Sequence, residues 1–273
     1  LSEALPYLKR YDSATIVIKL GGAAMSNIEN LSSFARDIVL MKQCKVNPII
    51  IHGGGPMINN ALNKWGIDFN FVDGKRVTDK KAVKIVEMVL SGDLNKNIVS
   101  SINNQGGKGV GISGKDASLV ICEKDNPELG YVGKPIHINT KLITTLVEND
   151  FIPVISPIGT NEEGETFNIN ADTMAGTIAS ALKADRLLLL TDVSGVKDKS
   201  GKKIERASTE EIKKLIKEDV IKDGMIPKVN TAIDSIEKGV RAVVILDGSI
   251  QNACLLELFT DHGVGTLIRK ELN

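Results

Sequence analysis

Apolar residues follow two patterns along this chain. In short runs nearly every residue is apolar and often β-branched, which is typical of strands buried on both faces of a sheet. In longer segments apolar residues recur every three or four positions, as they do in an amphipathic helix. The runs that predict buried strands lie at 15–20, 49–51, 151–155, in the first half of 185–197, and at 242–246.

The helical pattern fills the segments between these strands. The predicted helices lie at 31–41, 56–65, 78–102, 140–149, 174–182, 209–218, 228–238 and 253–260. Buried strands that alternate with helices predict an α/β fold, a three-layer αβα sandwich around a central, mostly parallel sheet. A further helix is predicted within residues 1–11, interrupted at Pro6.

Polar residues mark where several of these helices begin. Thr78 is the predicted N-cap of the long helix, with Asp79 in its first turn. Ser208 and Glu211 have the spacing of a capping box. Lys228 is predicted to open a helix, where its charge opposes the helix dipole unless an anion is bound there.

Two of the buried runs end in glycine loops. The first run carries Lys19 and is followed by Gly21 and Gly22, and the second leads into the three glycines 53–55. Lysine is seldom buried without a partner, and glycines let backbone N–H groups approach a ligand closely. The two loops together predict a phosphate or carboxylate site at the carboxyl edge of the sheet, although either loop alone is compatible with a structural turn.

Further polar groups are candidates for the same edge. Asn168, Asn170 and Asp172 alternate along a segment predicted to be extended, so all three are expected to face one side. Arg76 precedes the long helix and is a candidate for gripping a carboxylate, with a solvated surface arginine as the alternative. For Asn168, Asn170 and Asp172, the alternative is a strand face that is exposed to solvent.

Composition narrows the class of protein. The 273 residues include 34 basic and 34 acidic side chains, and this balance argues against a nucleic-acid surface. The sequence has no apolar run of membrane length and no signal peptide. The cysteines Cys44, Cys122 and Cys254 are widely spaced, which predicts buried, reduced thiols in a cytoplasmic protein and no protein metal site. The chain lacks a P-loop, and its Gly107–Gly111 segment does not have the dinucleotide-binding spacing.

Six motifs occur in an order that is familiar from one family. They are I-K-L-G-G at 18–22, H-G-G-G-P at 52–56, G-K-R-V-T-D at 74–79, F-N-I-N-A-D at 167–172, L-T-D-V-S-G-V at 190–196 and D-G-M-I-P-K at 223–228. The chain resembles the acetylglutamate kinase branch of the amino acid kinase family over nearly its whole length. The resemblance implies two lobes: an N-lobe at 15–183 for acetylglutamate binding and subunit contacts, and a C-lobe at 184–273 for nucleotide binding.

The resemblance also implies the reaction and its residues. The side-chain carboxylate of N-acetyl-L-glutamate would be phosphorylated by ATP with Mg²⁺, a step of arginine biosynthesis. Lys19 and Lys228 would stabilise the phosphoryl group in transfer, and Asp172 would hold both lysines. Implied substrate-binding residues are Gly54, Gly55, Arg76 and Asn168. Implied nucleotide-binding residues are Gly21, Gly22, Asp192, Val193, Ser194, Gly195, Val196 and Lys197.

The first residues of the chain resemble the extra helix of arginine-inhibited members. This implies that residues 1–14 take part in oligomerisation, in a homodimer or homohexamer, with arginine as an effector. Asn252 stands where those members have histidine, and His262 where acidic residues are common. A glutamate or aspartate kinase and a non-catalytic arginine-sensing scaffold are the alternatives.

Overall fold

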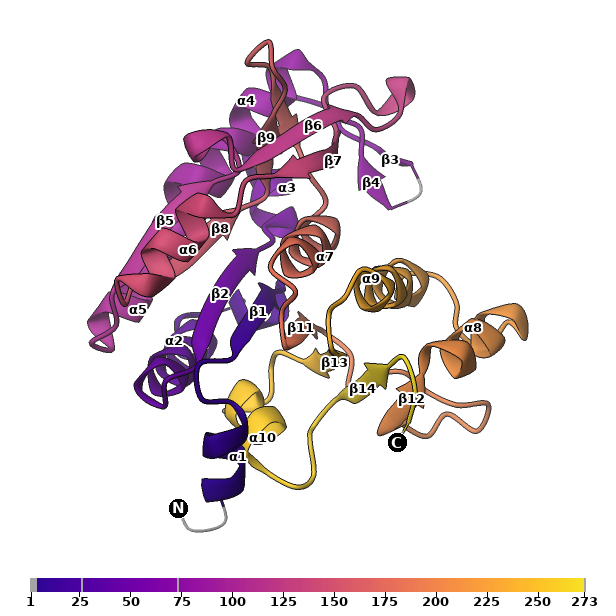
Figure 1. The fold of residues 1–273 in the computed structure, drawn as a ribbon. Helices are drawn as coiled ribbons and strands as arrows, with labels where there is room; N and C mark the ends of the chain where they lie inside the picture. The colour runs from indigo at the N-terminus through magenta and orange to yellow at the C-terminus, as the bar shows by residue number, and fades with distance from the viewer. Residues whose placement is uncertain (1–3, 26, 73, 273) are drawn as a thin grey trace.

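The fold is built around one long twisted sheet (Figure 1). The computed structural model describes residues 4–25, 27–72 and 74–272. Within this part of the chain, an eight-stranded sheet has the order β12-β14-β13-β11-β1-β2-β8-β5. In that order the strands are Arg206–Ser208, Thr266–Arg269, Val243–Asp247, Arg186–Thr191, Thr15–Leu20, Asn47–His52, Ile152–Ser156 and Gly109–Ser113.

The strands from β13 to β5 all run in the same direction. β14 pairs with β13 antiparallel, and β12 follows β14, so this edge of the sheet is reversed. β1 lies in the middle and pairs in parallel with β11 and β2. The carboxyl ends of these central strands therefore meet at one edge, where parallel sheets bind their ligands.

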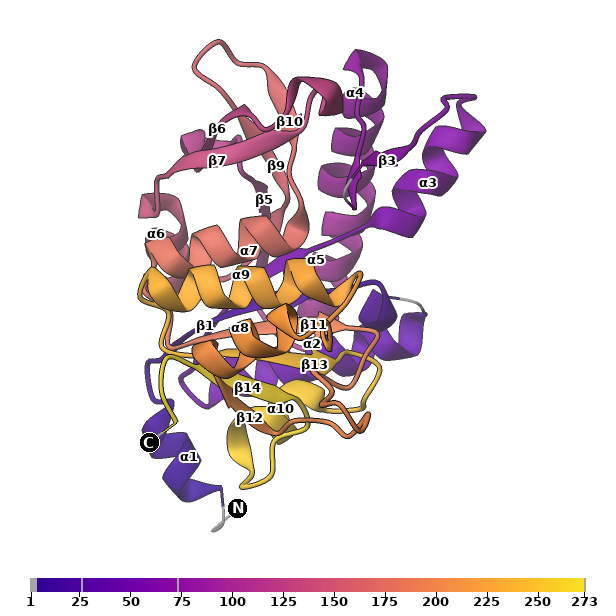
Figure 2. The same ribbon diagram turned by 90° about the vertical axis from the view of Figure 1, so that its right-hand side faces the viewer.

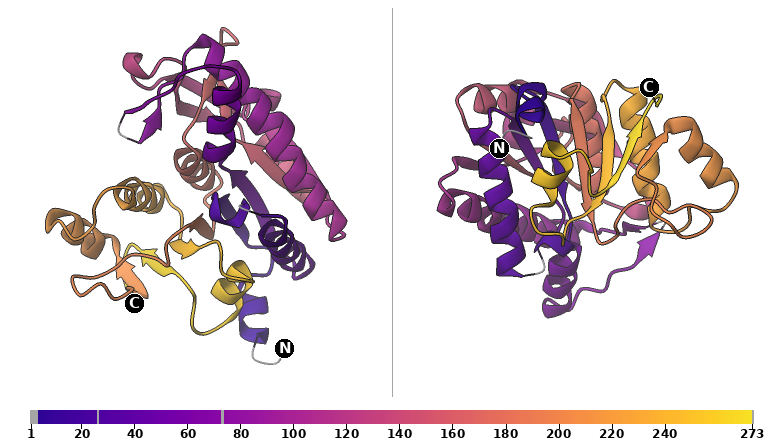
Figure 3. Two further views of the ribbon diagram at one scale, coloured as in Figure 1. Left: turned by 180° about the vertical axis from the view of Figure 1, so that it is seen from behind. Right: turned by 90° about the horizontal axis from the view of Figure 1, so that it is seen from below.

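Helices cover both faces of the sheet (Figure 3). On one side, Ile16, Ile18 and Leu20 of β1 pack with apolar residues of α2 and α10. On the other side, Val17 packs with residues of α7 and α9, which lie next to each other in Figure 2. The helices are α1 (Leu5–Arg10), α2 (Ile28–Gln43), α3 (Gly55–Lys64), α4 (Lys80–Glu87), α5 (Asn95–Asn104), α6 (Lys141–Glu148), α7 (Ala171–Ala181), α8 (Thr209–Lys217), α9 (Met225–Glu237) and α10 (Ala253–Phe259), with 3₁₀ turns η1 (Ala23–Met25), η3 (Asp116–Ser118) and η4 (Pro127–Leu129).

Two smaller sheets lie beyond the carboxyl edge of the central strands. One has the order β10-β9-β6-β7, and the other is the hairpin of β3 and β4. Their strands are Thr166–Asn168, Ile158–Thr160, Val120–Lys124, Gly133–Ile138, Phe71–Val72 and Lys75–Arg76. In Figure 1 these strands lie at the top of the molecule, above the ends of β1 and β2.

The predicted α/β fold with helices on both faces is confirmed. The capping box of Ser208 and Glu211 is present at the start of α8. The first helix begins at Leu5 with Pro6 in its first turn, where proline is tolerated, so Pro6 does not interrupt it. Leu1 lies outside the described residues.

Cys122 and Cys254 are buried as predicted, whereas Cys44 is only half-buried. No described helix has the length and apolar character needed to span a bilayer.

One local prediction was wrong, and two helices differ from the expected pattern in detail. Asp79, and not Thr78, is the N-cap of α4, because its side chain accepts the N–H groups of Lys81 and Ala82. The long helix contains a π-helical segment, η2 (Met88–Leu94). The buried apolar residues of this helix recur every four positions: Val86, Leu90, Leu94, Ile98 and Ile102. This interval exceeds the 3.6 residues of an α-helical turn. The wider π-helical turns keep these residues on one side of the helix. In α6 the residues expected to face inward, Leu142, Leu146 and Val147, are half-buried, and the fully buried residue is Ile143.

Candidate active site

Lys19 lies at the carboxyl edge of the sheet, one residue before β1 ends. Side chains alternate between the faces of a strand, so Lys19 is on the same face as Val17, the face that α7 and α9 cover. Its Nζ is 2.9 Å from Oδ1 of Asp172, and its side chain is 11% exposed. The predicted partner for this lysine is therefore present as an ion pair within the protein.

Asp172 lies in the first turn of α7, which corrects the prediction of an extended segment. The helix begins at Ala171, and Asn170 is its N-cap, accepting the N–H groups of Asp172 and Thr173. Asn170 therefore uses its side-chain oxygen to start the helix, so it does not form one polar row with Asn168 and Asp172. Asparagine is a typical capping residue, so Asn170 was a usable sequence signal for the start of this helix.

Lys228 completes a cluster of three charges. The helix α9 begins at Met225, so Lys228 belongs to its first turn but does not open it. Its Nζ donates to Oδ2 of Asp172 at 3.0 Å. Burial alone would raise the pKa of Asp172, but the ammonium groups of Lys19 and Lys228 outweigh it and hold that pKa below its ordinary value. The cluster thus carries one net positive charge from an anion held between two cations.

A cavity of about 250 Å³ opens beside Lys19. The residues that line it include the predicted Lys19, Gly21, Gly22, Gly54, Gly55, Arg76 and Asn168. They come from four stretches that are separated in the sequence: β1 with the loop after it, the start of α3, β4 and β10. The structure therefore brings the predicted phosphate loop and the predicted substrate residues to one cavity.

Two of the glycines are required by close packing. A Cβ on Gly21 would lie 2.4 Å from the carbonyl oxygen of Leu190, and a Cβ on Gly54 would lie 2.5 Å from Cδ1 of Leu94. Gly54 is also the N-cap of α3, where the first backbone N–H groups have no acceptor within the helix. These N–H groups are available to an anion in the cavity.

Arg76 is 7% exposed, so it is not a solvated surface arginine. Its Nη2 donates to Oδ1 of Asn59 at 2.5 Å and to the carbonyl of Gly55 at 3.4 Å. Its Nη1 is buried and has no hydrogen-bond partner among the described protein atoms. Burial lowers the pKa of Arg76 from its ordinary value, although arginine remains charged at neutral pH. A buried donor without a protein acceptor can bind an anion or a water molecule.

Asn168 is linked to the same arginine through Thr78. The Nδ2 atom of Asn168 donates to Oγ1 of Thr78 at 3.3 Å, and that hydroxyl donates to the carbonyl of Arg76 at 2.9 Å. Thr78 is fully buried. The network joins β10 to the loop before α4, so the two predicted substrate residues hold a defined position relative to each other.

The structure does not bring the segment 192–197 into this cavity. Asp192 and Val193 are exposed after the end of β11, whereas Val196 is 1% exposed and donates its N–H to Oγ1 of Thr266. A Cβ on Gly195 would lie 2.4 Å from that same hydroxyl oxygen. Close packing on β14 accounts for Gly195 and Val196, and a nucleotide role for the segment stays a prediction.

The sequence reasoning missed Asn59, Phe69 and Phe71. The Cζ atom of Arg76 lies 4.8 Å from the ring centroid of Phe69 and 4.7 Å from that of Phe71. Phe71 pairs with Arg76 across the β3–β4 hairpin. Two phenylalanines spaced by two residues before a turn were a usable signal for one face of a strand.

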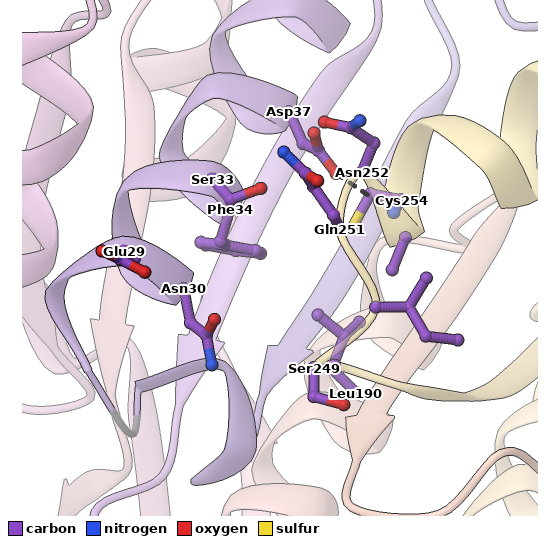
Figure 4. A pocket seen from close by; sticks show the side chains of 13 residues that line it. Glu29, Asn30, Ser33, Phe34, Asp37, Leu190, Ser249, Gln251, Asn252 and Cys254 are labelled. Carbon is purple, nitrogen blue, oxygen red and sulfur yellow. Dashed lines mark hydrogen bonds between the residues drawn. The ribbon is translucent and has the colours of Figure 1, made fainter.

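A second cavity, of about 220 Å³, lies between α2 and the turn before α10 (Figure 4). Asp37 is 2% exposed at its edge, and its Oδ2 accepts the N–H of Cys254 at 3.2 Å. Its Oδ1 has no partner among the described protein atoms. Burial raises the pKa of Asp37 to about 6, against the opposing effect of the backbone N–H groups of Cys254 and Leu255. This cavity contains none of the predicted catalytic residues.

We expect Asp37→Asn to stabilise the protein at pH 8 by about 1–3 kcal/mol. The folded state holds the Asp37 proton more tightly than the unfolded state, so the carboxylate costs stability as pH rises through about 6. The amide removes this charge and keeps an acceptor for Cys254. Urea unfolding at pH 8 and pH 5 measures the effect, and the gain should be smaller at pH 5. Destabilisation at pH 8 would show that the ionised form has a partner.

A third cavity, of about 410 Å³, lies between α1 and the carboxyl-terminal residues. Its charged lining residues are Arg10, Arg186, Glu205, Arg206, Glu257, Asp261 and Arg269. Tyr7 of α1 donates a hydrogen bond to Asp261 across it. His262 also lines this cavity, whereas Asn252 lines the second cavity.

No cluster of three or more His, Cys, Asp or Glu residues that could hold a metal ion occurs in the described part of the chain. Asp172 has both oxygens on lysines. A divalent cation at this site would therefore depend on oxygen ligands from a bound phosphate chain and water.

Comparisons with known proteins agree on one family. A family model described as "Amino acid kinase family" matches residues 14–247. The chain is 59% identical to an acetylglutamate kinase of Ruegeria pomeroyi over 271 residues, which is 99% of this chain and 94% of the relative. An N-acetylglutamate synthase of Neisseria gonorrhoeae, solved with coenzyme A and N-acetyl-glutamate, superposes with a TM-score of 0.89 at 25% identity. It covers all of this chain, and this chain spans 63% of its length. A carbamate kinase of Giardia lamblia has the same fold, with a TM-score of 0.71 at 19% identity over 95% of this chain and 99% of that chain.

Proposed function

The chain belongs to the amino acid kinase family, and from this premise we propose that it phosphorylates N-acetyl-L-glutamate. The γ-phosphoryl group of ATP is transferred to the side-chain carboxylate, giving N-acetyl-L-glutamyl 5-phosphate and ADP in arginine biosynthesis. The observation that carries the proposal is the cluster in which Lys19 and Lys228 hold the two oxygens of buried Asp172 beside a cavity that contains Arg76.

The cluster suits phosphoryl transfer because that reaction needs positioning and neutralisation of charge. Lys19 and Lys228 stabilise the phosphoryl group from two sides, and Asp172 positions both ammonium groups. A carboxylate oxygen of the substrate attacks the γ-phosphorus, and the bond to the β-phosphate oxygen breaks as ADP leaves. The attacking carboxylate is already ionised at neutral pH, so no general base is required.

The charge of the cavity favours an acetylated substrate. Among the described residues that line it, the charged ones are Lys19, Lys75 and Arg76, all of them positive. A free amino acid would place an ammonium group there without an acidic partner, whereas acetylation makes that nitrogen a neutral amide. Val132 and Pro157 add apolar lining that can contact an acetyl methyl group. This argues for acetylglutamate over the glutamate or aspartate kinase alternative.

ATP is the co-substrate, and Mg²⁺ would neutralise its β- and γ-phosphate oxygens. The backbone N–H groups of Gly21 and Gly22 donate to the phosphates. Arg76 binds the α-carboxylate, Asn168 bonds the acetylated nitrogen, and the N–H groups of Gly54 and Gly55 donate to the substrate. We assign acetylglutamate binding and subunit contacts to residues 15–183 and the nucleotide to 184–273, including 192–197. The cytoplasmic location stays a prediction.

Hydroxylamine trapping tests the proposed chemistry. An acyl phosphate reacts with hydroxylamine to give a hydroxamate and inorganic phosphate, so the product can be detected by its ferric complex. We expect hydroxamate to form only when the protein, MgATP and N-acetyl-L-glutamate are all present. ADP release without hydroxamate would mean that water, and not the carboxylate, accepts the phosphoryl group.

We also infer feedback inhibition by arginine at the third cavity. It presents carboxylates and guanidinium groups together, which suits a ligand with both charges, since Glu257, Arg186 and Arg269 all line it. Because α1 forms one wall, an oligomer built through residues 1–14 would couple this cavity to assembly. Calorimetry with arginine should show binding by the wild type and weaker binding after Glu257→Gln, with Glu237→Gln as the exposed control. Equal binding by both variants would place arginine elsewhere.

A further inference from the structure

Three residues outside the six motifs surround the guanidinium of Arg76. We infer that Asn59, Phe69 and Phe71 form a clamp that positions Arg76 for the substrate carboxylate and thereby sets the affinity for the substrate. The inference rests on the proposed function and names positioning residues for that site. The clamp consists of these three side chains.

The two aromatic rings pack against the guanidinium from adjacent sides. The Cζ atom of Arg76 lies 4.8 Å from one ring centroid and 4.7 Å from the other. The rings of Phe69 and Phe71 are 6.2 Å apart at an interplanar angle of 85°. A planar cation packed in the corner of two aromatic rings keeps its charge but loses part of its freedom to rotate.

Asn59 then selects which edge of the guanidinium remains for a ligand. Its Oδ1 accepts from Nη2 at 2.5 Å, and the carbonyl of Gly55 is a weaker acceptor for the same atom at 3.4 Å. Nη1 is left without a hydrogen-bond partner among the described protein atoms. Because Asn59 occupies Nη2, the clamp leaves Nη1 as the donor for the substrate carboxylate. Arg76 then binds that carboxylate through one terminal nitrogen and not through both.

The clamp also joins the two elements that line the substrate side of the cavity. Asn59 belongs to α3, the helix that begins at the Gly54 and Gly55 loop. Phe71 lies on β3 and is paired with Arg76 on β4. A hydrogen bond from β4 to α3 therefore ties the hairpin to the glycine loop. The distance between the guanidinium and the backbone N–H groups of that loop is set by this contact.

Steady-state kinetics of clamp variants tests the inference. We expect Asn59→Ala and Phe71→Leu each to raise the KM for N-acetyl-L-glutamate about fivefold to tenfold. The KM for ATP and kcat should stay within about twofold, because the clamp touches neither the phosphates nor the lysine cluster. Phe71→Tyr keeps a ring face and should retain the wild-type KM. Phe151→Leu, at a partly exposed phenylalanine outside the cavity, is the matched control.

A double-mutant cycle separates positioning from a general effect on folding. In the Arg76→Ala background the clamp has nothing to position, so adding Asn59→Ala should not raise KM further. An equal, additive rise in both backgrounds would overturn the inference. So would an unchanged KM in Asn59→Ala and Phe71→Leu when the wild type is active. A wild-type protein without turnover on N-acetyl-L-glutamate would instead refute the proposed function.

Discussion

Lys228→Ala is expected to lower kcat by about 10²–10³-fold while the protein stays folded. The ammonium group of Lys228 lies 3.0 Å from Oδ2 of Asp172, and the lysine side chain is 19% exposed. Its removal takes away one of two charges that stabilise the phosphoryl group in transfer. Asp172 keeps Lys19 as a partner at 2.9 Å, so no buried charge is left without a counterion.

Initial rates at saturating MgATP and N-acetyl-L-glutamate measure this effect, and thermal unfolding checks the fold. Lys238→Ala is the matched control, because Lys238 is an exposed lysine at the other end of α9. We expect the control to keep full activity. Near-normal turnover in Lys228→Ala would remove the lysine from the chemistry, and a large drop in thermal stability would assign it a structural role instead.

Arg76→Ala is expected to raise the KM for N-acetyl-L-glutamate by about 10²-fold with little change in the KM for ATP. The guanidinium is the buried donor group of the cavity, and its Nη1 has no acceptor among the described protein atoms. A charge-assisted hydrogen bond lost from a largely buried site costs more than one at the surface.

Two further arginine variants test which property of Arg76 causes the rise in KM. Arg76→Lys retains a charge but loses the flat group that packs against the Phe69 and Phe71 rings, so an intermediate KM is expected. Arg241→Ala removes an exposed arginine that pairs with Asp185 and should leave kinetics unchanged. If the KM for ATP rose as much as that for N-acetyl-L-glutamate in Arg76→Ala, the arginine would serve the nucleotide and not the substrate.

The layered fold could be predicted because the signals that define it are local. Strands such as 15–20 are largely apolar, and helices such as α8 carry a complete capping box. The position of Lys19 at the edge of the sheet followed from the glycines after it. These features depend on neighbours in the sequence, so periodicity and turn residues reveal them.

Other features depend on residues that are distant in the sequence. The spacing of Asn168, Asn170 and Asp172 fits both an extended strand and the start of a helix, because the two patterns look alike over so few residues. In the structure Asn170 caps α7, so Asp172 is helical. The contact of Asn59 with Arg76 joins α3 to a hairpin, and no local pattern marks it. The hydrogen bond between Asp37 and Cys254 likewise joins α2 to α10, and no local pattern marks it.

The proposal depends most on a substrate that carries no ammonium group, and the specificity constants test this directly. The measurement is ADP release with MgATP, comparing kcat/KM for N-acetyl-L-glutamate, L-glutamate and L-aspartate under the same conditions. We predict turnover with N-acetyl-L-glutamate at least about 10²-fold more efficient than with either free amino acid, because the cavity would leave their ammonium groups unpaired. Equal or better turnover with L-glutamate would contradict the assignment and make the protein a kinase for the unacetylated amino acid.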